Sequence, residues 1–424
     1  MESERVRRNL AAYKYSSPTK SLCERLFLVR FWNWFTEFLP RNIAPNVLTL
    51  TGFAASLVAW GIIVIHSPDL SGATPTSLYP LLAFLLFLYQ TMDGCDGPQA
   101  RRLSCGSALG ELVDHGVDAV VTTIDVFVLF EILGFSLNNG AILIAIVGSQ
   151  VAFVLSNMTL LHMGRQVFNE IDCQEAQIII QCLLVGTWVY YDVLDAESRE
   201  YPALSQLALP LPGVVDAVVS HLPSADDFRV DEASEAGMGT YQFRWLFIAV
   251  GAIATTWGNT TTLFARIALR YTSSKSQTTE QTHVEGDERI GAGLLWRQAL
   301  ACIVWSVLVV ASWTLIADTE DTGVWPLWML LVTFAFGNFA LNNLVIRVTK
   351  TPLPNIFYIP SFRIVALWCV LAYFVPRENP LVYWCALCVP AAAAVLQEVD
   401  YSMRLAGHIT EALKIPFWTV PKKK

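Results

Sequence analysis

Apolar residues occur along this chain in blocks of about 20, the length that an α-helix needs to cross a ~30 Å hydrocarbon core. Polar segments bound each block, so the pattern predicts an all-α polytopic membrane protein. Ten spans are expected, at residues 47–66, 76–92, 107–134, 141–162, 176–195, 241–268, 293–317, 325–346, 361–376 and 381–403. The polar segments 196–240 and 272–291 are expected to be solvated connectors.

An amphipathic pattern precedes the first span. In SLCERLFLVRFWNWFTEFLP, residues 21–40, apolar positions such as Leu26 and Trp32 are interleaved with charged ones such as Arg25. This pattern predicts a helix that lies in the membrane interface and is closed by Pro40. An ordinary juxtamembrane segment is the alternative.

Composition supports the membrane assignment. The chain is 54% hydrophobic and only 15% charged, whereas soluble domains hold about 25% charged residues. Much of the net charge of -8 comes from the two polar connectors, so it does not indicate a basic ligand. No basic stripe resembles a nucleic-acid-binding surface, and no nucleic-acid partner is expected.

Lys and Arg are distributed unevenly between the connecting segments. One side receives the basic N-terminal arm, Arg101, Arg102, Arg165, and the segments around Arg270, Arg347 and Lys422–Lys424. The other side receives 66–77, 134–140 and 318–323, which contain neither residue type, and the long segment 196–240, which holds only Arg199 and Arg229 among many acids; Arg377 is the one further exception. The positive-inside rule therefore places both termini and the segment 93–118 in the cytosol.

That segment, DGCDGPQARRLSCGSALGELVDHGVD, carries four aspartates at the edge of an apolar region: Asp93, Asp96, Asp114 and Asp118. Acids at a bilayer are costly unless cations neutralise them. Asp93 and Asp96 share one face of a helix, and Asp114 and Asp118 share a face of the next. Two carboxylates from each helix can then converge on a pair of metal ions.

Hard carboxylate oxygens suit Mg²⁺ or Mn²⁺, which commonly bridge to substrate phosphates. Two such ions can stabilise the attacking and leaving oxygens of an in-line displacement at phosphorus. Arg101 adds a planar fork suited to phosphate. The pattern therefore favours phosphoryl-type transfer at the cytosolic surface, with a lipid available from the bilayer.

Three other interpretations of the four acids fit the sequence less well. A purely structural role for the acids requires matched cations, and only Arg101 and Arg102 are near in sequence. A multi-pass cation transporter would place its acids near the bilayer midplane, often in repeated halves. A prenyl-diphosphate enzyme typically uses closely spaced DDxxD pairs, which this chain lacks.

The run also matches D-x2-D-G-x2-A-R-x8-G-x3-D-x3-D and so resembles the CDP-alcohol phosphotransferase family. The segments YKYS, FWNWFTEFLPRNIAPNVLTLTGF and GELVDHGVD resemble its eukaryotic choline/ethanolamine branch. The resemblance is close over residues 13–120 and loose elsewhere. Pro98 departs from it, since this branch would have Lys there, and Pro98 is expected at the first turn of a helix.

The resemblance implies that two Mg²⁺ ions, with Mn²⁺ as a possible substitute, bind the diphosphate of CDP-choline or CDP-ethanolamine. The residues implied to hold the metals are Asp93, Asp96, Asp114 and Asp118, and those implied to line the nucleotide are Asn46, Gly97, Ala100, Arg101 and Gly110. The 3-hydroxyl of diacylglycerol attacks the β-phosphorus, CMP leaves, and a phospholipid forms. The resemblance further implies a homodimer in the endoplasmic reticulum or Golgi.

The general base stays open between two residues. Asp118 is the usual family assignment, but metal coordination can occupy it, and His115 can exchange a proton near neutral pH. Glu111, one turn before His115, could orient it or touch substrate. Choline, ethanolamine and dual specificity also stay open, as does another head group such as inositol.

The expected organisation follows from the spans and the motif. It comprises a cytosolic N-terminal arm and amphipathic helix (1–45), catalytic helices (46–200), a luminal loop (201–240), C-terminal transmembrane helices (241–404) and a cytosolic tail (405–424).

Overall fold

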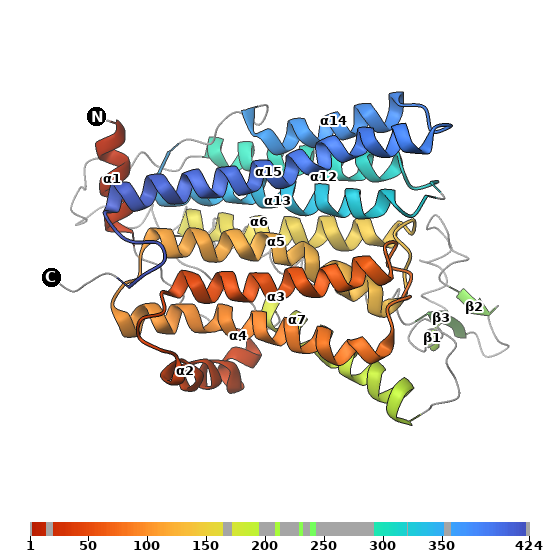
Figure 1. Ribbon diagram of the computed structural model, residues 1–424, viewed down its shortest axis with the longest axis horizontal. Coiled ribbons are helices and arrows are strands. Elements are labelled where there is room, and N and C mark those ends of the chain that lie inside the picture. The colour runs from red at the N-terminus through yellow and green to blue at the C-terminus, as the bar shows by residue number, and fades with distance from the viewer. Residues whose placement is uncertain are drawn as a thin grey trace.

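Long helices lie side by side along a common direction in the computed structural model (Figure 1). The structure describes residues 2–13, 20–163, 172–194, 208–212, 229–231, 238–242, 292–319, 321–351 and 358–420. The long helices are α3 (Pro45–His66), α4 (Tyr79–Leu103), α5 (Ala108–Leu133), α6 (Ala141–Met163), α7 (Cys173–Trp188), α12 (Ala292–Thr314), α13 (Val324–Thr349), α14 (Pro360–Phe374) and α15 (Pro380–Leu413). The single-turn helices η2 (Thr76–Leu78) and η3 (Val189–Leu194) adjoin α4 and α7. The all-α class is confirmed.

Seven helices in the described part of the chain are long and apolar enough to cross a membrane. They correspond to seven of the ten expected spans. α14 covers the expected span 361–376 but is shorter, and 243–268 lies outside the described residues. α5 covers 107–134 as a helix, but acids recur along its whole length: Glu111, Asp114, Asp118, Asp125 and Glu131.

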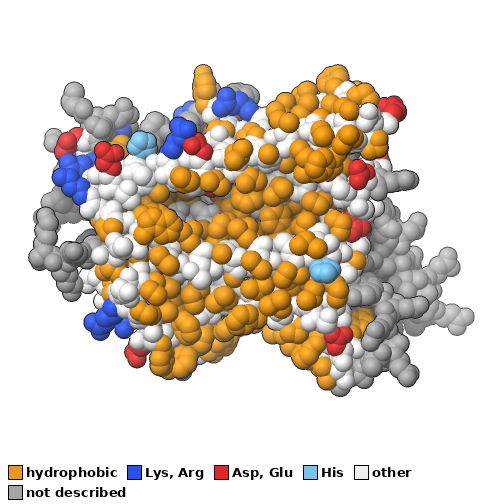
Figure 2. Space-filling model, viewed as in Figure 1, with side chains coloured by type: hydrophobic (Ala, Val, Ile, Leu, Met, Phe, Trp, Pro, Cys, Tyr) orange, Lys and Arg blue, Asp and Glu red, His pale blue; other side chains and the backbone are white. Residues whose placement is uncertain are grey.

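α13 occupies the centre of the bundle. Of its apolar stretch, 89% is buried inside the protein, as expected for a helix that is hydrophobic on all sides. Trp328 and Phe336 on this helix are fully buried, together with Trp305 of α12. On the outer face in Figure 2, hydrophobic side chains cover the flank of the bundle, and Lys and Arg gather toward the end that carries the termini.

The predicted amphipathic helix is present as the π-helical turn η1 (Glu24–Leu28) followed by α2 (Val29–Phe38). Its buried side chains Leu28 and Trp32 face α4, whereas Trp34 and Phe38 are exposed. Gly94 on α4 permits this packing, because a Cβ there would lie 2.1 Å from the Trp32 ring. α2 is therefore fixed against the helix that carries Asp93 and Asp96.

The segment 201–240, expected to be a loop, contains short strands. β1 (Ala208–Pro212), β2 (Arg229–Asp231) and β3 (Met238–Gln242) form an antiparallel sheet in the order β1-β3-β2. This sheet lies at the end of the bundle opposite the termini (Figure 1). The N-terminal helix α1 (Glu2–Ala12), the C-terminal segment and the α4–α5 connection share the other end.

Candidate active site

The α4–α5 connection brings two acid-bearing helix faces together. α4 ends at Ser104, which takes the left-handed conformation with φ 54°. Ser107 then caps α5, because its hydroxyl oxygen accepts a hydrogen bond from the Gly110 backbone N–H at 3.3 Å. The chain therefore reverses within a few residues, and the last turns of α4 face the first turns of α5.

The four aspartates converge as predicted. Ligand atoms of Asp93, Asp96 and Asp114 lie within 4.8 Å of one another, and those of Asp114, His115 and Asp118 do so as well. Asp114 belongs to both groups. The two groups together offer adjacent positions for divalent cations.

The donor set fits a hard divalent metal ion. All four aspartates supply carboxylate oxygen, and Oδ1 of Asp93 is buried without a hydrogen-bond partner among the described residues. A buried acceptor in that condition is costly unless a cation or a proton meets it. Like charges at this spacing also repel one another, which a bound cation would relieve.

Pro98 does not occupy a first helical turn, contrary to expectation. α4 runs without interruption from Tyr79 to Leu103, so Pro98 lies inside the helix. Proline has no N–H, and the carbonyl of Gly94 therefore loses the donor that an interior residue would supply. The helix nonetheless continues through Ala100 and Arg101.

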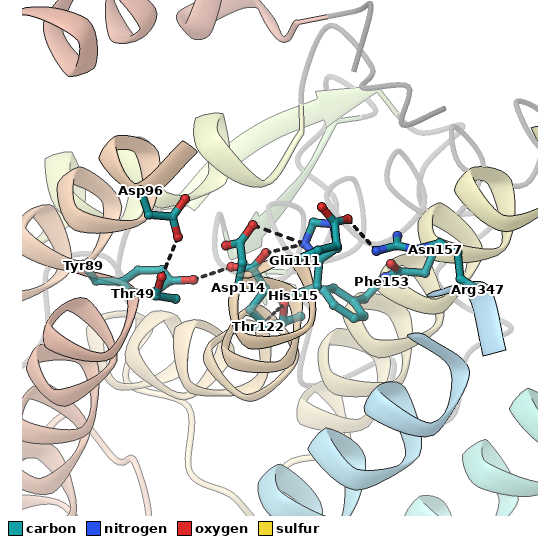
Figure 3. Close-up of polar contacts among 11 residues, drawn as sticks. Thr49, Tyr89, Asp96, Glu111, Asp114, His115, Thr122, Phe153, Asn157 and Arg347 are labelled. Carbon is teal, nitrogen blue, oxygen red and sulfur yellow. Dashed lines mark hydrogen bonds and ion pairs between the residues drawn. The ribbon is translucent and has the colours of Figure 1, made fainter. Parts of the chain in front are cut away.

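Hydroxyl donors hold two of the aspartates (Figure 3). Thr49 of α3 donates to Oδ2 of Asp96 at 2.5 Å. Tyr89 of α4 donates to Oδ1 of Asp118 at 2.7 Å. Sequence reasoning missed both residues, although Tyr89 lies one turn before Asp93 on the same helical face.

His115 lies between two carboxylates. Its Nε2 is 3.0 Å from Oε1 of Glu111, and its Nδ1 is 3.3 Å from Oδ2 of Asp118. Nδ1 is also 3.8 Å from Oδ2 of Asp114. The ring therefore joins the aspartate cluster to Glu111, which is buried behind it.

Glu111 pairs with Arg347, whose Nη2 lies 2.5 Å from Oε1 of Glu111 (Figure 3). The positive-inside argument placed Arg347 in a connecting segment, which is wrong. The residue lies within α13 and is buried. The Tyr13 ring is 5.8 Å from the Arg347 guanidinium, and burial raises the pKa of Tyr13 above its usual range, so its hydroxyl stays protonated beside Glu111.

The two glycines expected to line the nucleotide border space rather than packed protein. A Cβ on Gly97 would meet only Nη1 of Arg101, at 3.4 Å, and one on Gly110 would lie 3.7 Å from Oδ1 of Asn46. These are ordinary contact distances. Protein packing therefore does not require glycine at either position, whereas a ligand close to the backbone would.

The two neighbouring arginines have different surroundings. Arg102 donates to the backbone carbonyls of Thr36, Glu37 and Leu39 and so closes the end of α2. Arg101 is exposed and forms no hydrogen bond or ion pair with the residues that the structure describes. Arg101 is thus available to a phosphate, and Arg102 is not.

Asn46 is buried at the start of α3 beside Gly110. Its Nδ2 donates to the backbone carbonyl of Phe417 at 3.2 Å, and Ile43 pairs with Thr419 in an isolated β-bridge. The C-terminal segment 415–420 therefore lies beside the start of α3, where Asn46 borders Gly110. Nothing local in the sequence signals this contact across 371 positions.

Comparison with known proteins agrees with this geometry. Residues 42–212 match the family model described as CDP-alcohol phosphatidyltransferase. This segment of the chain is therefore similar to the CDP-alcohol phosphatidyltransferase family. The four aspartates, the glycines, Arg101 and Asn46 all fall inside it, which confirms the resemblance drawn from the motif.

Three relatives illustrate the similarity. Choline/ethanolaminephosphotransferase 1 of Saccharomyces cerevisiae is 36% identical over 43% of this chain and 46% of its own length. Cholinephosphotransferase 1 of Xenopus laevis is 30% identical over 50% of this chain and 52% of its own length. That of Danio rerio is 42% identical over 27% of this chain and 30% of its own length. The chain thus spans about half the length of these relatives, or less.

Proposed function

We propose that this protein transfers phosphocholine, phosphoethanolamine or both from the CDP-alcohol to the 3-hydroxyl of diacylglycerol. The observation that carries the proposal is the convergence of four aspartates from α4 and α5 within the segment that matches the CDP-alcohol phosphatidyltransferase family model. The products are CMP and phosphatidylcholine or phosphatidylethanolamine. The names of the yeast, frog and fish relatives support these head groups.

Two Mg²⁺ ions, or Mn²⁺ in their place, would be held by Asp93, Asp96 and Asp114 and by Asp114 and Asp118, and would neutralise charge on the diphosphate. The space beside Gly97, Ala100 and Gly110 would receive the CMP portion. Arg101 would bind a phosphate oxygen, and Oδ1 of Asn46 would accept from the nucleotide.

In the proposed reaction, the acceptor oxygen forms a bond to the β-phosphorus as the bond to the bridging oxygen breaks. The bridging oxygen leaves with CMP. His115 would take the hydroxyl proton at Nδ1, because a neutral ring that keeps its hydrogen on Nε2, toward Glu111, leaves Nδ1 as an acceptor. Asp118 is the alternative base, but metal coordination would occupy its carboxylate.

A multi-pass cation transporter is the alternative from another class. The acids that converge belong to the C-terminal part of α4 and the N-terminal part of α5, next to the α4–α5 connection, and this position favours a substrate from solution over a midplane ion site. Another CDP-alcohol phosphotransferase, with inositol or a different head group, is the alternative within the family. We also propose a homodimer in the endoplasmic reticulum or Golgi, with the site and both termini cytosolic.

The test is CMP release by the purified full-length protein in lipid nanodiscs with diacylglycerol, Mg²⁺ and either CDP-choline or CDP-ethanolamine. Turnover that chelation abolishes is expected, and the ratio of the two rates gives the head-group preference. No turnover with either nucleotide would refute the proposal. His115→Ala should abolish turnover while nucleotide binding persists, and the exposed His408 on α15 provides the matched control His408→Ala.

A further inference from the structure

The Arg347–Glu111 ion pair is buried at the junction of α13 and α5. Arg347 is 7% exposed and Glu111 is 8% exposed. Burial of two charges carries a large desolvation cost that their attraction often fails to offset. The presence of this buried ion pair is therefore weak evidence that it serves only to stabilise the fold.

Packing between the two helices does not require the pair. α13 is the most thoroughly buried of the described spans, and its Gly337 allows Val120 of α5 to approach closely, with a Cβ at Gly337 falling 2.8 Å from Val120. Leu341 and Leu344 of α13 also pack against Leu112 of α5. The two helices would remain joined without an ion pair.

The same oxygen of Glu111 contacts both partners. Oε1 is 2.5 Å from Nη2 of Arg347 and 3.0 Å from Nε2 of His115. A carboxylate behind a histidine sets the orientation of the ring and the nitrogen that carries the hydrogen. Arg347 fixes the position of that carboxylate from the side remote from the aspartates.

No other cation shares this role among the described residues. Arg102 is committed to α2, and Arg101 forms no ion pair with Glu111. Arg347 itself has no second carboxylate partner in the described part of the chain. Its charge is directed at Glu111.

We propose that Arg347 is a positioning residue that acts through Glu111 on His115. The inference rests on the proposed function and extends it to a residue outside the matched segment 42–212. The C-terminal half of the chain thereby contributes to the site. The segment 42–212 contains Glu111 and His115 but not the cation that holds them.

The test uses the full-length protein in nanodiscs and compares Arg347→Met with Arg404→Met. Arg404 is the matched control, because its ion pair with Asp400 on α15 is exposed, with the two side chains 73% and 50% accessible. Arg347→Met should lower kcat roughly 10- to 100-fold, the usual effect of losing a residue that orients a ligand. The KM for the CDP-alcohol should change less than about threefold, and so should the affinity for the nucleotide in the presence of the metal. Arg404→Met should leave kcat and KM unchanged.

A double-mutant comparison shows whether Glu111 transmits the effect. Arg347→Met should cause almost no further loss in a Glu111→Gln background, since residues acting as one unit are not additive. Arg347→Lys should recover part of kcat. If Arg347→Met does not fold, Arg347→Gln makes the same comparison, because its amide retains a donor without the charge.

The outcomes separate the two proposals. An inactive wild type overturns the proposed function and this inference with it. An active wild type overturns the inference alone if the Arg347 variant keeps its kcat, if only KM changes, or if the losses from Arg347 and Glu111 multiply independently.

Discussion

Thr49 on α3 donates its hydroxyl hydrogen to Asp96 on α4, with Oγ1 and Oδ2 2.5 Å apart. This hydrogen bond joins a third helix to the two that carry the aspartates. A carboxylate oxygen of Asp96 lies within 4.8 Å of ligand oxygens of Asp93 and Asp114. The orientation of a metal ligand is therefore set by a residue that is not itself a ligand.

Thr49→Val should weaken metal binding about 10-fold, because the Asp96 carboxylate loses the donor that fixes its orientation. Titration of Mn²⁺ into the purified protein measures the change. Thr51→Val is the matched control, since the Thr51 hydroxyl is exposed and donates to the carbonyl of Val47 on its own helix. Equal metal affinity in the two variants would contradict the assigned role of Thr49.

Tyr89→Phe removes the hydrogen bond to Asp118 while it retains the aromatic ring. We expect a fall in kcat of about 10-fold, since the Asp118 carboxylate loses the donor that fixes its orientation as a metal ligand. Steady-state CMP release gives the value. Tyr373→Phe, at an exposed position on α14, should have no effect. If Tyr89→Phe had the same kcat as Tyr373→Phe, the hydrogen bond from Tyr89 to Asp118 would not be needed for turnover.

How far the site could be predicted depends on how far apart in the sequence its residues lie. The aspartates lie on two helices that follow one another in the chain. Helical periodicity places each pair on one face, the short α4–α5 connection brings the two faces together, and Tyr89 extends the face of α4. Arg347 pairs with Glu111 across 236 positions, and no local pattern encodes that contact. The positive-inside rule counts an Arg at the end of an apolar run in the same way whether its side chain is in solvent or buried. Only the packing of the helices shows that the Arg347 side chain is buried.

The membrane spans could be predicted, because each span is a local feature that depends on the hydropathy of one continuous stretch of sequence. α5 was recognised as a helix although it carries more acids than the other described spans. The sheet β1–β3 was not expected, since its short strands lie in a polar segment without an alternating pattern.

Alanine at Gly97 or Gly110 should separate ligand binding from folding. A Cβ at either position meets the protein only at ordinary contact distances, so the thermal unfolding temperature should hardly change. The same methyl group would intrude where the nucleotide is proposed to bind, and KM for the CDP-alcohol should rise at least about 10-fold, equivalent to roughly 1.4 kcal/mol.

Gly94→Ala on the same helix is the contrasting variant. Its Cβ would lie 2.1 Å from the Trp32 ring, so α2 must move and stability should fall by about 1–3 kcal/mol. Thermal melts and nucleotide titrations of the three variants make the comparison. If Gly97→Ala lowered the thermal unfolding temperature but left nucleotide affinity unchanged, Gly97 would serve packing and not nucleotide binding.

Asp114 is shared by both ligand groups, whereas Asp96 belongs to one. Asp114→Asn should therefore weaken the binding of both metal ions, and Asp96→Asn mainly that of one. Electron paramagnetic resonance of bound Mn²⁺ counts the ions independently of turnover. The wild type should bind two ions and lose both to chelation. A single ion in the wild type would contradict the two-metal proposal.

The contact between Asn46 and Phe417 predicts a role for the C-terminal segment in nucleotide binding. Since the Asn46 amide donates to the Phe417 carbonyl, its Oδ1 is directed toward Gly110, where it can accept from the nucleotide. Deletion of residues 415–424 frees the amide to rotate. Loss of one such oriented hydrogen bond is worth about 1 kcal/mol, so KM for the CDP-alcohol should rise about fivefold with kcat little changed.

Deletion of residues 421–424 alone is the control, because it leaves Phe417 and Thr419 in place. Asn46→Ala should raise KM to the same extent as the longer deletion, and the two changes together should have no larger effect. Fully additive effects would show that the segment acts on the site by another route than Asn46. An unchanged KM in the longer deletion would show that it does not act on nucleotide binding.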